Sequence, residues 1–203
     1  MIRFILVTIL ALFLQSCATI SRTPQTTTPS SEAATVPTTS WAERKIALSH
    51  LQQWDLRGKL GITTAQDSGS ATLNWQQNHD AFHISLMGPL GASGVTIDGN
   101  THAVRLTNAK GKTFTAANPE QLLAEQTGWR LPISYLKYWA KGLPVPNLPE
   151  QGQWDNEHRL QELSQGGWRI SYQAYARARG LDLPSRMVIQ QPGFRAKLVI
   201  YSW

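Results

Sequence analysis

The sequence predicts a mainly β fold with a few helices (α+β), arranged as a strongly curved antiparallel sheet with the helices packed against one side. Along much of the chain every second residue is apolar, and turn-forming residues separate these stretches, which is typical of antiparallel strands joined by hairpins. Two segments instead have apolar residues at helical spacing between a start signal and a glycine. The 41% hydrophobic share of the 203 residues supplies a packed core and excludes a wholly disordered chain.

Residues 1–16 have the pattern of a signal peptide. Arg3 places a positive charge ahead of the apolar run 4–14, which is too short to cross a bilayer of about 30 Å and suits the apolar region of an export signal. The next residues, Leu-Gln-Ser-Cys at 14–17, resemble the lipobox of bacterial lipoproteins, although Gln15 differs from the small residue usual at that place.

Cys17 is the single cysteine of the chain, which excludes an intramolecular disulfide and a zinc site built on paired cysteines. In lipobox proteins this cysteine is acylated and becomes the mature N-terminus, so the resemblance implies lipid attachment at Cys17. The alternative, a buried free cysteine, is disfavoured by the polar residues that follow. Ala18 stands where an aspartate would retain such a protein at the inner membrane. The rule for these proteins therefore implies anchoring at the periplasmic face of the outer membrane of a Gram-negative bacterium.

Residues 17–40 predict a lipidated flexible tether, because fifteen of the twenty-three positions after Cys17 are Ser, Thr or Pro. As a flexible coil it would span roughly 25–30 Å. Residues 41–203 then form a single domain, expected to be a monomer. The formal charge of +6, without a dense basic run, fits anionic lipid headgroups or an acidic protein partner better than nucleic acid.

The domain is expected to begin with a helix and continue as a meander of strands. Ser40 and Glu43 have capping-box spacing, and Trp41, Leu48 and Leu51 fall along one side of the helix that follows. The apolar faces of the strands are then Trp54, Leu56, Leu60 and Ile62; Ala71, Leu73 and Trp75; Phe82, Ile84 and Leu86; Val95 and Ile97; and Val104 and Leu106. Turn signals lie at 77–80, 98–100 and 108–112, the last leading to a strand at Phe114.

Two helices interrupt the strands. One is expected to start at 118–120 (Asn-Pro-Glu) and to stop at Gly128, with Leu122 and Leu123 facing inward. The other starts at Pro132 and carries Ile133, Leu136 and Trp139 at helical spacing. Strand candidates resume at 159–163, 168–172, 186–190 and 195–203, and turn residues at 165–167 and 191–193 divide them into pairs.

The sequence contains no complete catalytic or metal-binding motif. Residues 91–94 are one short of the G-x-S-x-G elbow and lack its strand-turn-helix context. His79 and His83 are four apart on a hairpin and strand, about 13 Å along a strand, so a shared metal ion is not expected. The remaining candidates, His50, His102, His158, Asp55, Asp98, Asp155 and Glu162, form no acid–base pattern. We expect no catalytic residue, no metal and no cofactor.

An unusual feature is the turn at 88–91. Gly88, Pro89 and Gly91 break the strand as turn residues should, yet Leu90 stands at the tip, where polar residues are usual. Leu90 either folds back onto the core or forms an apolar finger that touches a membrane or a lipid.

The aromatic residues leave a similar choice open. Trp54, Trp75, Phe82 and Trp168 occupy inward-facing strand positions and are most simply a core. A curved sheet covered by helices can also enclose a cavity lined by large apolar side chains. The sequence is compatible with a filled interior and with a hollow one.

The chain resembles the LolB family of outer-membrane lipoprotein receptors. The resemblance rests on the lipobox at Cys17, the Gly-Pro-Leu-Gly stretch at 88–91, residues 108–112 before the Phe114 strand, residues 122–128, and the helix ending at 138–144. It implies an unclosed antiparallel β-barrel covered by helices, with an apolar cavity for acyl chains. The periplasmic carrier LolA has a similar fold but no lipidated cysteine, so Cys17 favours the receptor.

The activity implied by the resemblance is non-enzymatic. Such a receptor accepts client lipoproteins from a LolA-like carrier and inserts their acyl chains into the inner leaflet of the outer membrane, among its phospholipids. Leu90 matches the leucine on the family's projecting loop, so Gly88, Pro89, Leu90 and Gly91 are expected to form a membrane-insertion loop. The expected cavity lining is Trp54, Leu56, Leu60, Leu73, Trp75, Phe82, Ile84, Leu86 and Trp168. The alternatives are an outer-membrane assembly scaffold with a packed interior and no lipid ligand and, least favoured, a hydrolase with an unrecognised site.

Overall fold

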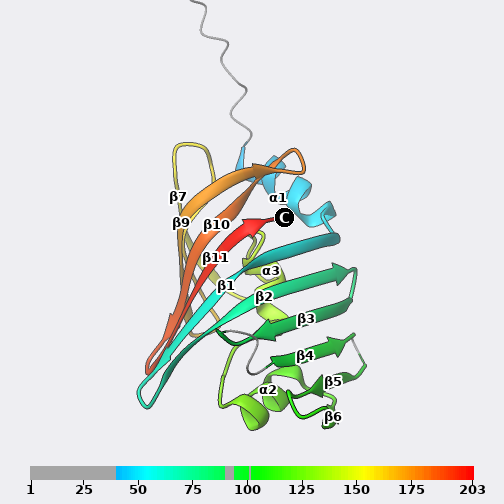
Figure 1. Ribbon diagram of the computed structural model, residues 1–203. Coiled ribbons are helices and arrows are strands. Elements are labelled where there is room, and N and C mark those ends of the chain that lie inside the picture. The colour runs from blue at the N-terminus through cyan, green and yellow to red at the C-terminus, as the bar shows by residue number, and fades with distance from the viewer. Residues whose placement is uncertain (1–39, 90–93, 101) are drawn as a thin grey trace, which may run out of the picture. The chain divides into compact units, whose positions relative to one another are not determined.

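One antiparallel sheet of eleven strands makes up most of the described chain (Figure 1). A computed structural model describes residues 40–89, 94–100 and 102–203, which all belong to the unit 37–203. The predicted signal peptide, Cys17, and Leu90 and Gly91 of the expected insertion loop lie outside the described residues.

The strands are β1 (Gln53–Thr64), β2 (Ser68–Asn78), β3 (Ala81–Met87), β4 (Gly94–Gly99), β5 (Val104–Thr107), β6 (Thr113–Ala116), β7 (Glu150–Trp154), β8 (Leu160–Gln165), β9 (Trp168–Ala178), β10 (Leu181–Gln191) and β11 (Phe194–Ser202). The helices are α1 (Trp41–His50), α2 (Pro119–Thr127) and α3 (Ile133–Trp139). The strand order is β6-β5-β4-β3-β2-β1-β11-β10-β9-β8-β7.

Two meanders, β1–β6 and β7–β11, join through the pairing of β1 with β11. Helices α2 and α3 connect the meanders and lie on one face of the curved sheet (Figure 1). In the described chain, β6 and β7 are the two edges and do not pair with each other, so the barrel is not closed. The predicted fold class is therefore confirmed.

The helix ends follow the local signals in the sequence. Ser40 and Glu43 form a complete capping box at the start of α1. Asn118 caps α2 by accepting a hydrogen bond from the amide of Gln121 at 3.0 Å, and Gly128 ends the helix in the left-handed conformation, with φ of 76°.

The predicted alternation of the strands is also observed. On β1, Trp54, Leu56, Leu60 and Ile62 are all buried on the face that the helices cover. Gly58 interrupts the series at a bulge opposite β11, where a Cβ atom would stand 2.3 Å from the carbonyl oxygen of Val199. A residue with a side chain would therefore push the two central strands apart.

The sequence did not indicate β7 or the full length of β9 and β10. Four of the five residues of β7 are exposed, because the strand lies at an edge, so it shows no apolar alternation. Strands β9 and β10 run on beyond their expected ends, at Tyr172 and Arg186, to a hairpin at Arg179 and Gly180, both with positive φ. Burial is irregular in this extension, where the pairing of β9 with β10 shifts register near Pro184.

Candidate functional site

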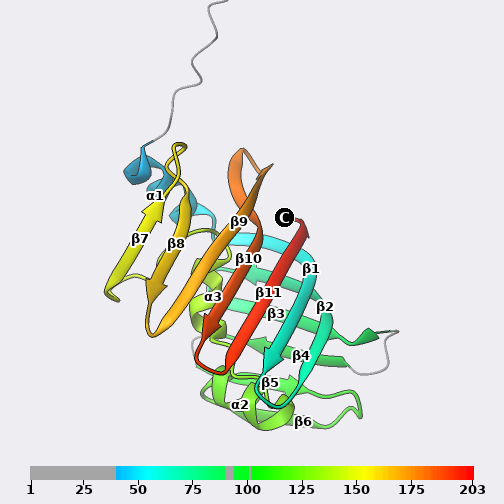
Figure 2. The ribbon, with the colours of Figure 1, turned by 90° about the vertical axis from the view of Figure 1, so that its left-hand side faces the viewer.

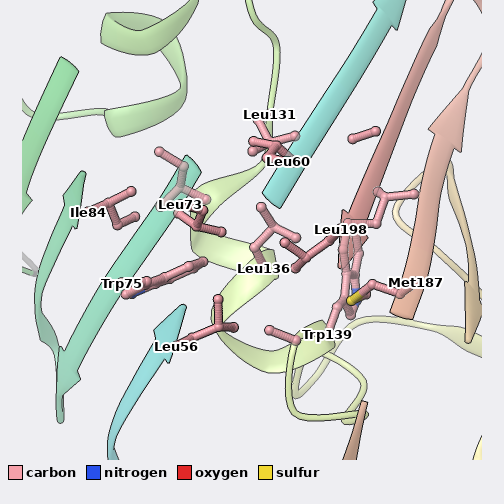
Figure 3. Packing of buried hydrophobic residues seen from close by; sticks show 14 of the residues in the cluster. Leu56, Leu60, Leu73, Trp75, Ile84, Leu131, Leu136, Trp139, Met187 and Leu198 are labelled. Atoms are coloured by element: carbon pink, nitrogen blue, oxygen red, sulfur yellow. The ribbon is translucent and has the colours of Figure 1, made fainter. Parts of the chain in front are cut away.

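The space between the inner face of the sheet and helices α2 and α3 is entirely apolar (Figure 3). Strands from both meanders and the segment from α2 to α3 contribute its lining, which consists of Leu60, Leu73, Trp75, Ile84, Leu86, Ile97, Leu123, Leu131, Ile133, Leu136, Ile189 and Leu198. The cavity that remains between these side chains has a volume of about 20 Å³.

A cavity of about 20 Å³ is close to the minimum needed for one water molecule, whereas an engineered apolar cavity that binds benzene measures about 150 Å³. In this conformation the interior is therefore filled by its own side chains. It can take a long apolar ligand only if the helices and the sheet move apart.

Five of the nine residues expected to line a cavity border this space: Leu60, Leu73, Trp75, Ile84 and Leu86. The other four do not border the cavity. Trp54, Leu56 and Trp168 are buried in the same core, and Phe82 is half-buried and packs against that core. Trp54 packs on Trp75, with ring centroids 5.2 Å apart, and Trp168 packs on Trp139 at 6.3 Å.

The helical side of the lining was not among the expected site residues. Ile133 and Leu136 were recognised only as the inward face of a helix, and Leu131 precedes that helix without any periodic signal. Ile189 and Leu198 were also not among the expected site residues. They lie on β10 and β11, far from β1–β4 in the sequence, but β11 pairs with β1 in the sheet and β10 follows β11.

Helix α3 is tied to the second meander by buried hydrogen bonds. The indole Nε1 of Trp139 donates to Oε1 of Gln165 at 3.0 Å, and the hydroxyl of Tyr172 donates to the carbonyl oxygen of Trp139 at 3.0 Å. All three side chains are buried. Burial also raises the pKa of Tyr172 well above its ordinary value, so the hydroxyl stays protonated and remains a donor.

Gln165 extends this connection to the segment after α3. Its Oε1 also accepts from the amide of Val145 at 2.8 Å, and its Nε2 donates to the carbonyl oxygens of Val145 and Leu148, both at 3.0 Å. One buried amide side chain thus makes four hydrogen bonds. These bonds fix the end of β8 to residues 139–148.

Helix α2 has far fewer polar connections. It packs through Leu122 and Leu123 beside β5 and β6. In the part of the chain that the structure describes, its one hydrogen bond to another element runs from the amide of Ser134 to Oε1 of Glu120, at 2.7 Å. The two helices that cover the interior therefore differ in their polar attachment: α3 is hydrogen-bonded to the sheet, whereas α2 packs on it through apolar side chains.

Lys141 is a buried cation just beyond α3. Its Nζ donates to the carbonyl oxygens of Leu48 at 3.3 Å and Leu51 at 2.9 Å, at the C-terminal end of α1. A positive charge is favourable at this end of a helix. Burial, together with the charge of Lys137, nevertheless lowers the pKa of Lys141 to about 8.

Gly88 and Pro89 of the expected insertion loop are described and directly follow the end of β3. The last residue of that strand, Met87, is 37% exposed on the face turned away from the helices. The sequence analysis did not single out this methionine, although its place next to the inward-facing Leu86 puts it on the opposite face of the strand.

His83 and Asp98 form an exposed pair that was not expected. Nδ1 of His83 lies 2.6 Å from Oδ1 of Asp98, on adjacent strands β3 and β4. Among the described residues, no group of three or more His, Cys, Asp or Glu side chains is placed to hold a metal ion. Within those residues there is likewise no helix long and apolar enough to cross a membrane.

Comparison with known proteins decides the family. The family model described as "Outer membrane lipoprotein LolB" matches residues 52–203. The chain belongs to the LolB family. It is 39% identical over 194 residues to the outer-membrane lipoprotein LolB of Stutzerimonas stutzeri, covering 96% of this chain and 91% of the relative. It is 41% identical over 164 residues to LolB of Pseudomonas aeruginosa (strain LESB58), covering 81% and 80% of the two chains.

Solved structures agree with this LolB-family fold. A LolA superfamily protein from Nitrosomonas europaea is similar with a TM-score of 0.50 at 8% identity, over 80% of this chain and 90% of that one. A putative outer membrane lipoprotein-sorting protein domain from Vibrio parahaemolyticus gives a TM-score of 0.51 at 8% identity, over 79% and 92%. At such low identity these likenesses concern the fold alone.

Proposed function

We propose that this LolB-family chain is an outer-membrane lipoprotein that accepts lipoproteins from a LolA-like periplasmic carrier and inserts them into the inner leaflet of the outer membrane. The observation that carries the proposal is the interior made only of Leu, Ile and Trp side chains between the sheet and two helices. The activity is non-enzymatic, because acyl chains pass from one apolar enclosure to another and no covalent bond changes.

Uptake of an acyl chain requires the interior to open. The cavity of about 20 Å³ has room for about one water molecule, so it is far too small for a chain of many methylene groups. Because the described α2 has no hydrogen bond to the sheet, we take it as the element that moves away from β5 and β6. Helix α3 keeps its place, because the bonds of Trp139 to Gln165 and Tyr172 hold it on the sheet.

The bound acyl chain offsets the cost of opening. Each methylene removed from water contributes about 0.8 kcal/mol, so a long chain can stabilise an open form that the empty protein rarely visits. For the same reason the chain does not escape into water and leaves only for another apolar phase. The bilayer is the phase in which many lipid chains surround it, which makes release there effectively irreversible.

The remaining parts of the chain have roles in this scheme. Residues 1–16 are the signal peptide, Cys17 carries the acyl anchor, residues 17–40 are the tether and residues 41–203 are the lipoprotein-binding domain. The tether lets the domain meet the carrier and then return to the membrane. The loop of Gly88, Pro89, Leu90 and Gly91 then enters the bilayer with Leu90 foremost and lowers the barrier to release.

A two-step transfer assay tests the proposal. A carrier of the LolA type, loaded with a labelled lipoprotein, is mixed with the full-length acylated chain in detergent-free vesicles. We expect the label to move first to this chain and then to the bilayer. If the label stays on the carrier while this chain is folded, the proposal is wrong.

One observation favours the second candidate, an outer-membrane assembly scaffold without a lipid ligand. The interior is filled in the described conformation, as a scaffold would require. Titration with a fluorescent long-chain fatty acid separates the two functions. Saturable binding supports the receptor, whereas no binding by the folded chain supports the scaffold.

A further inference from the structure

Four neighbouring strands, β9, β10, β11 and β1, carry a set of basic side chains on the face turned away from α2 and α3. Figure 2 looks onto this side of the sheet. We call this set the outer basic face; its members are all exposed and are Arg57, Lys59, Arg169, Arg186, Arg195 and Lys197.

Among the described residues, the six cations of this face make no ion pair within 4.0 Å, although Glu162 on the adjoining strand β8 lines the same outer hollow as Arg169 and Arg195. The four strands contain two carboxylates, Asp55 and Asp182, and both are already paired. Asp55 lies 3.6 Å from Arg179, while Asp182 lies 3.4 Å from Arg177 and 3.9 Å from Arg44. Within the described ranges, none of the six members of the outer basic face has an ion-pair partner.

The strand register distributes these cations over the face of the sheet. Lys59 and Arg186 share a row across the sheet and are separated by Val199, and Arg195 and Arg169 share another row, separated by Gln190. Residues two strands apart are about 10 Å from each other, and the same-strand pairs Arg57/Lys59 and Arg195/Lys197 are about 7 Å apart. Cations spread over four strands in this way match a surface whose negative charges are distributed over its area.

We infer that the outer basic face docks on the anionic phospholipids of the membrane to which the chain is anchored. The inference rests on the proposed function in one respect, because it takes the acylated Cys17 to hold the domain beside a bilayer. A tether of roughly 25–30 Å keeps the face at high local concentration near the lipid headgroups. Basic residues close to an anionic leaflet are attracted to it.

Two exposed residues of the same sheet face favour a bilayer over an acidic protein. Tyr201 on β11 is 68% exposed and lies on the same face of the strand as Val199 and Lys197. Tyrosine is typical of membrane–water interfaces. Met87 is 37% exposed and continues the row of Lys59 through Thr72. Met87 directly precedes the loop 88–91. The last side chain before the proposed insertion loop therefore lies on the face that we assign to the membrane.

The test uses the full-length acylated chain reconstituted in vesicles. Acylated Cys17 offers no free thiol, so a fluorophore can be attached to a Thr72→Cys variant, and quenching by a nitroxide in the lipid headgroup reports contact with the bilayer. In vesicles of phosphatidylethanolamine and phosphatidylglycerol we expect quenching at least about threefold above that in phosphatidylcholine vesicles. In about 1 M NaCl, where the Debye length is about 3 Å, the difference should disappear.

Matched charge reversals identify the surface. When Lys59→Glu and Lys197→Glu are introduced together into the labelled Thr72→Cys variant, quenching in anionic vesicles should fall to the level seen in phosphatidylcholine vesicles. Lys45→Glu with Lys110→Glu changes the net charge equally at exposed positions away from the face and should leave the quenching unchanged. Equal quenching by the two double variants would overturn the inference. So would unchanged quenching with slower uptake from LolA in the Lys59/Lys197 variant, because the face would then bind an acidic protein.

This readout is separate from that of the proposed function. A chain that fails to take the labelled lipoprotein from LolA but shows anionic-lipid quenching would overturn the receptor function and support the docking face. A chain that transfers lipoprotein normally but shows no such quenching would support the receptor and overturn the docking face.

Discussion

The side chains of Trp139 and Gln165 are joined inside the core, where the indole Nε1 donates to Oε1 at 3.0 Å. Trp139 is the last residue of α3, and Gln165 is the last residue of β8. The bond therefore connects the helical layer to the sheet at a place where both side chains are almost inaccessible to water. Helix α3 is therefore fixed to the sheet, whereas α2 is the part of the helical layer that we expect to move.

Gln165→Ala should lower the free energy of unfolding by about 2–4 kcal/mol, because it leaves buried donors and acceptors of Trp139, Val145 and Leu148 without partners. Urea unfolding followed by tryptophan fluorescence measures the change. Gln161→Ala, at an exposed position on the same strand, is the control and should have little effect. Similar stability of the two variants would show that the Gln165 bonds do not hold the segment.

Stability should rise with pH between about 8 and 10 because of Lys141. Its pKa is lowered to about 8 from the ordinary 10.5, so across this window the unfolded chain binds more protons than the folded chain. Above about pH 10 the buried Tyr172 and the half-buried Tyr175, whose pKa values are raised by desolvation, reverse the trend, because the unfolded state loses their protons first.

Urea unfolding at several pH values checks this dependence. Lys141→Met should remove most of the rise in unfolding free energy, whereas Lys110→Met, at an exposed turn, should leave it in place. An unchanged pH slope in the Lys141 variant would mean that its ammonium group is not perturbed in the folded chain.

Leu123→Ala should destabilise the chain and also speed the uptake of an acyl probe. Leu123 is fully buried on α2, and its truncation should cost about 2–5 kcal/mol while loosening the helix that must move. Stopped-flow fluorescence with a long-chain fatty acid measures the uptake rate. Leu163→Ala on β8 removes an equally buried leucine and should destabilise the chain without faster uptake. Equal rates in the two variants would argue against opening at α2.

Leu90→Glu should slow membrane insertion of a bound lipoprotein more than it slows uptake from LolA, since a carboxylate is costly to place in hydrocarbon. The two steps of the transfer assay measure both rates. Gln66→Glu adds the same charge at the exposed β1–β2 turn and serves as the control. Normal delivery by the Leu90 variant would refute the insertion-loop role.

Cys17→Ala should abolish acylation and release the folded domain from the membrane. Mass spectrometry of the mature N-terminus and fractionation in high salt, which suppresses contacts of the outer basic face, measure the two effects. The chain should still accept lipoproteins from LolA in solution. Retention of the Cys17 variant in the membrane fraction at high salt would contradict the proposed anchor.

Local patterns were sufficient to predict most of the secondary structure. The alternation of Trp54, Leu56 and Leu60 identified β1 and its buried face, because a strand places alternate side chains on opposite faces. Asn118 and Gly128 delimited α2, because capping depends on neighbouring backbone groups and on the positive φ that glycine tolerates. Such signals act over a few residues, so a single sequence displays them.

The functional arrangement depended on strand order and register, which join residues far apart in the chain. Sequence periodicity placed Trp75 and Ile84 on an inner face, but only packing against Leu123 and Leu136 decided that this interior is filled. The partners of Gln165 and Lys141 were also decided by tertiary structure, since a buried polar side chain is recognisable only from the groups around it.

The outer basic face has the same origin. Lys59 and Lys197 are distant in sequence and become neighbours because β1 pairs with β11. The sequence by itself therefore determined the elements, their buried faces and the resemblance to a lipid-anchored family, all of which follow from short-range chemistry. The size of the interior, the different hydrogen bonding of its two helices and the grouping of basic side chains on the outer face were decided by long-range pairing and packing.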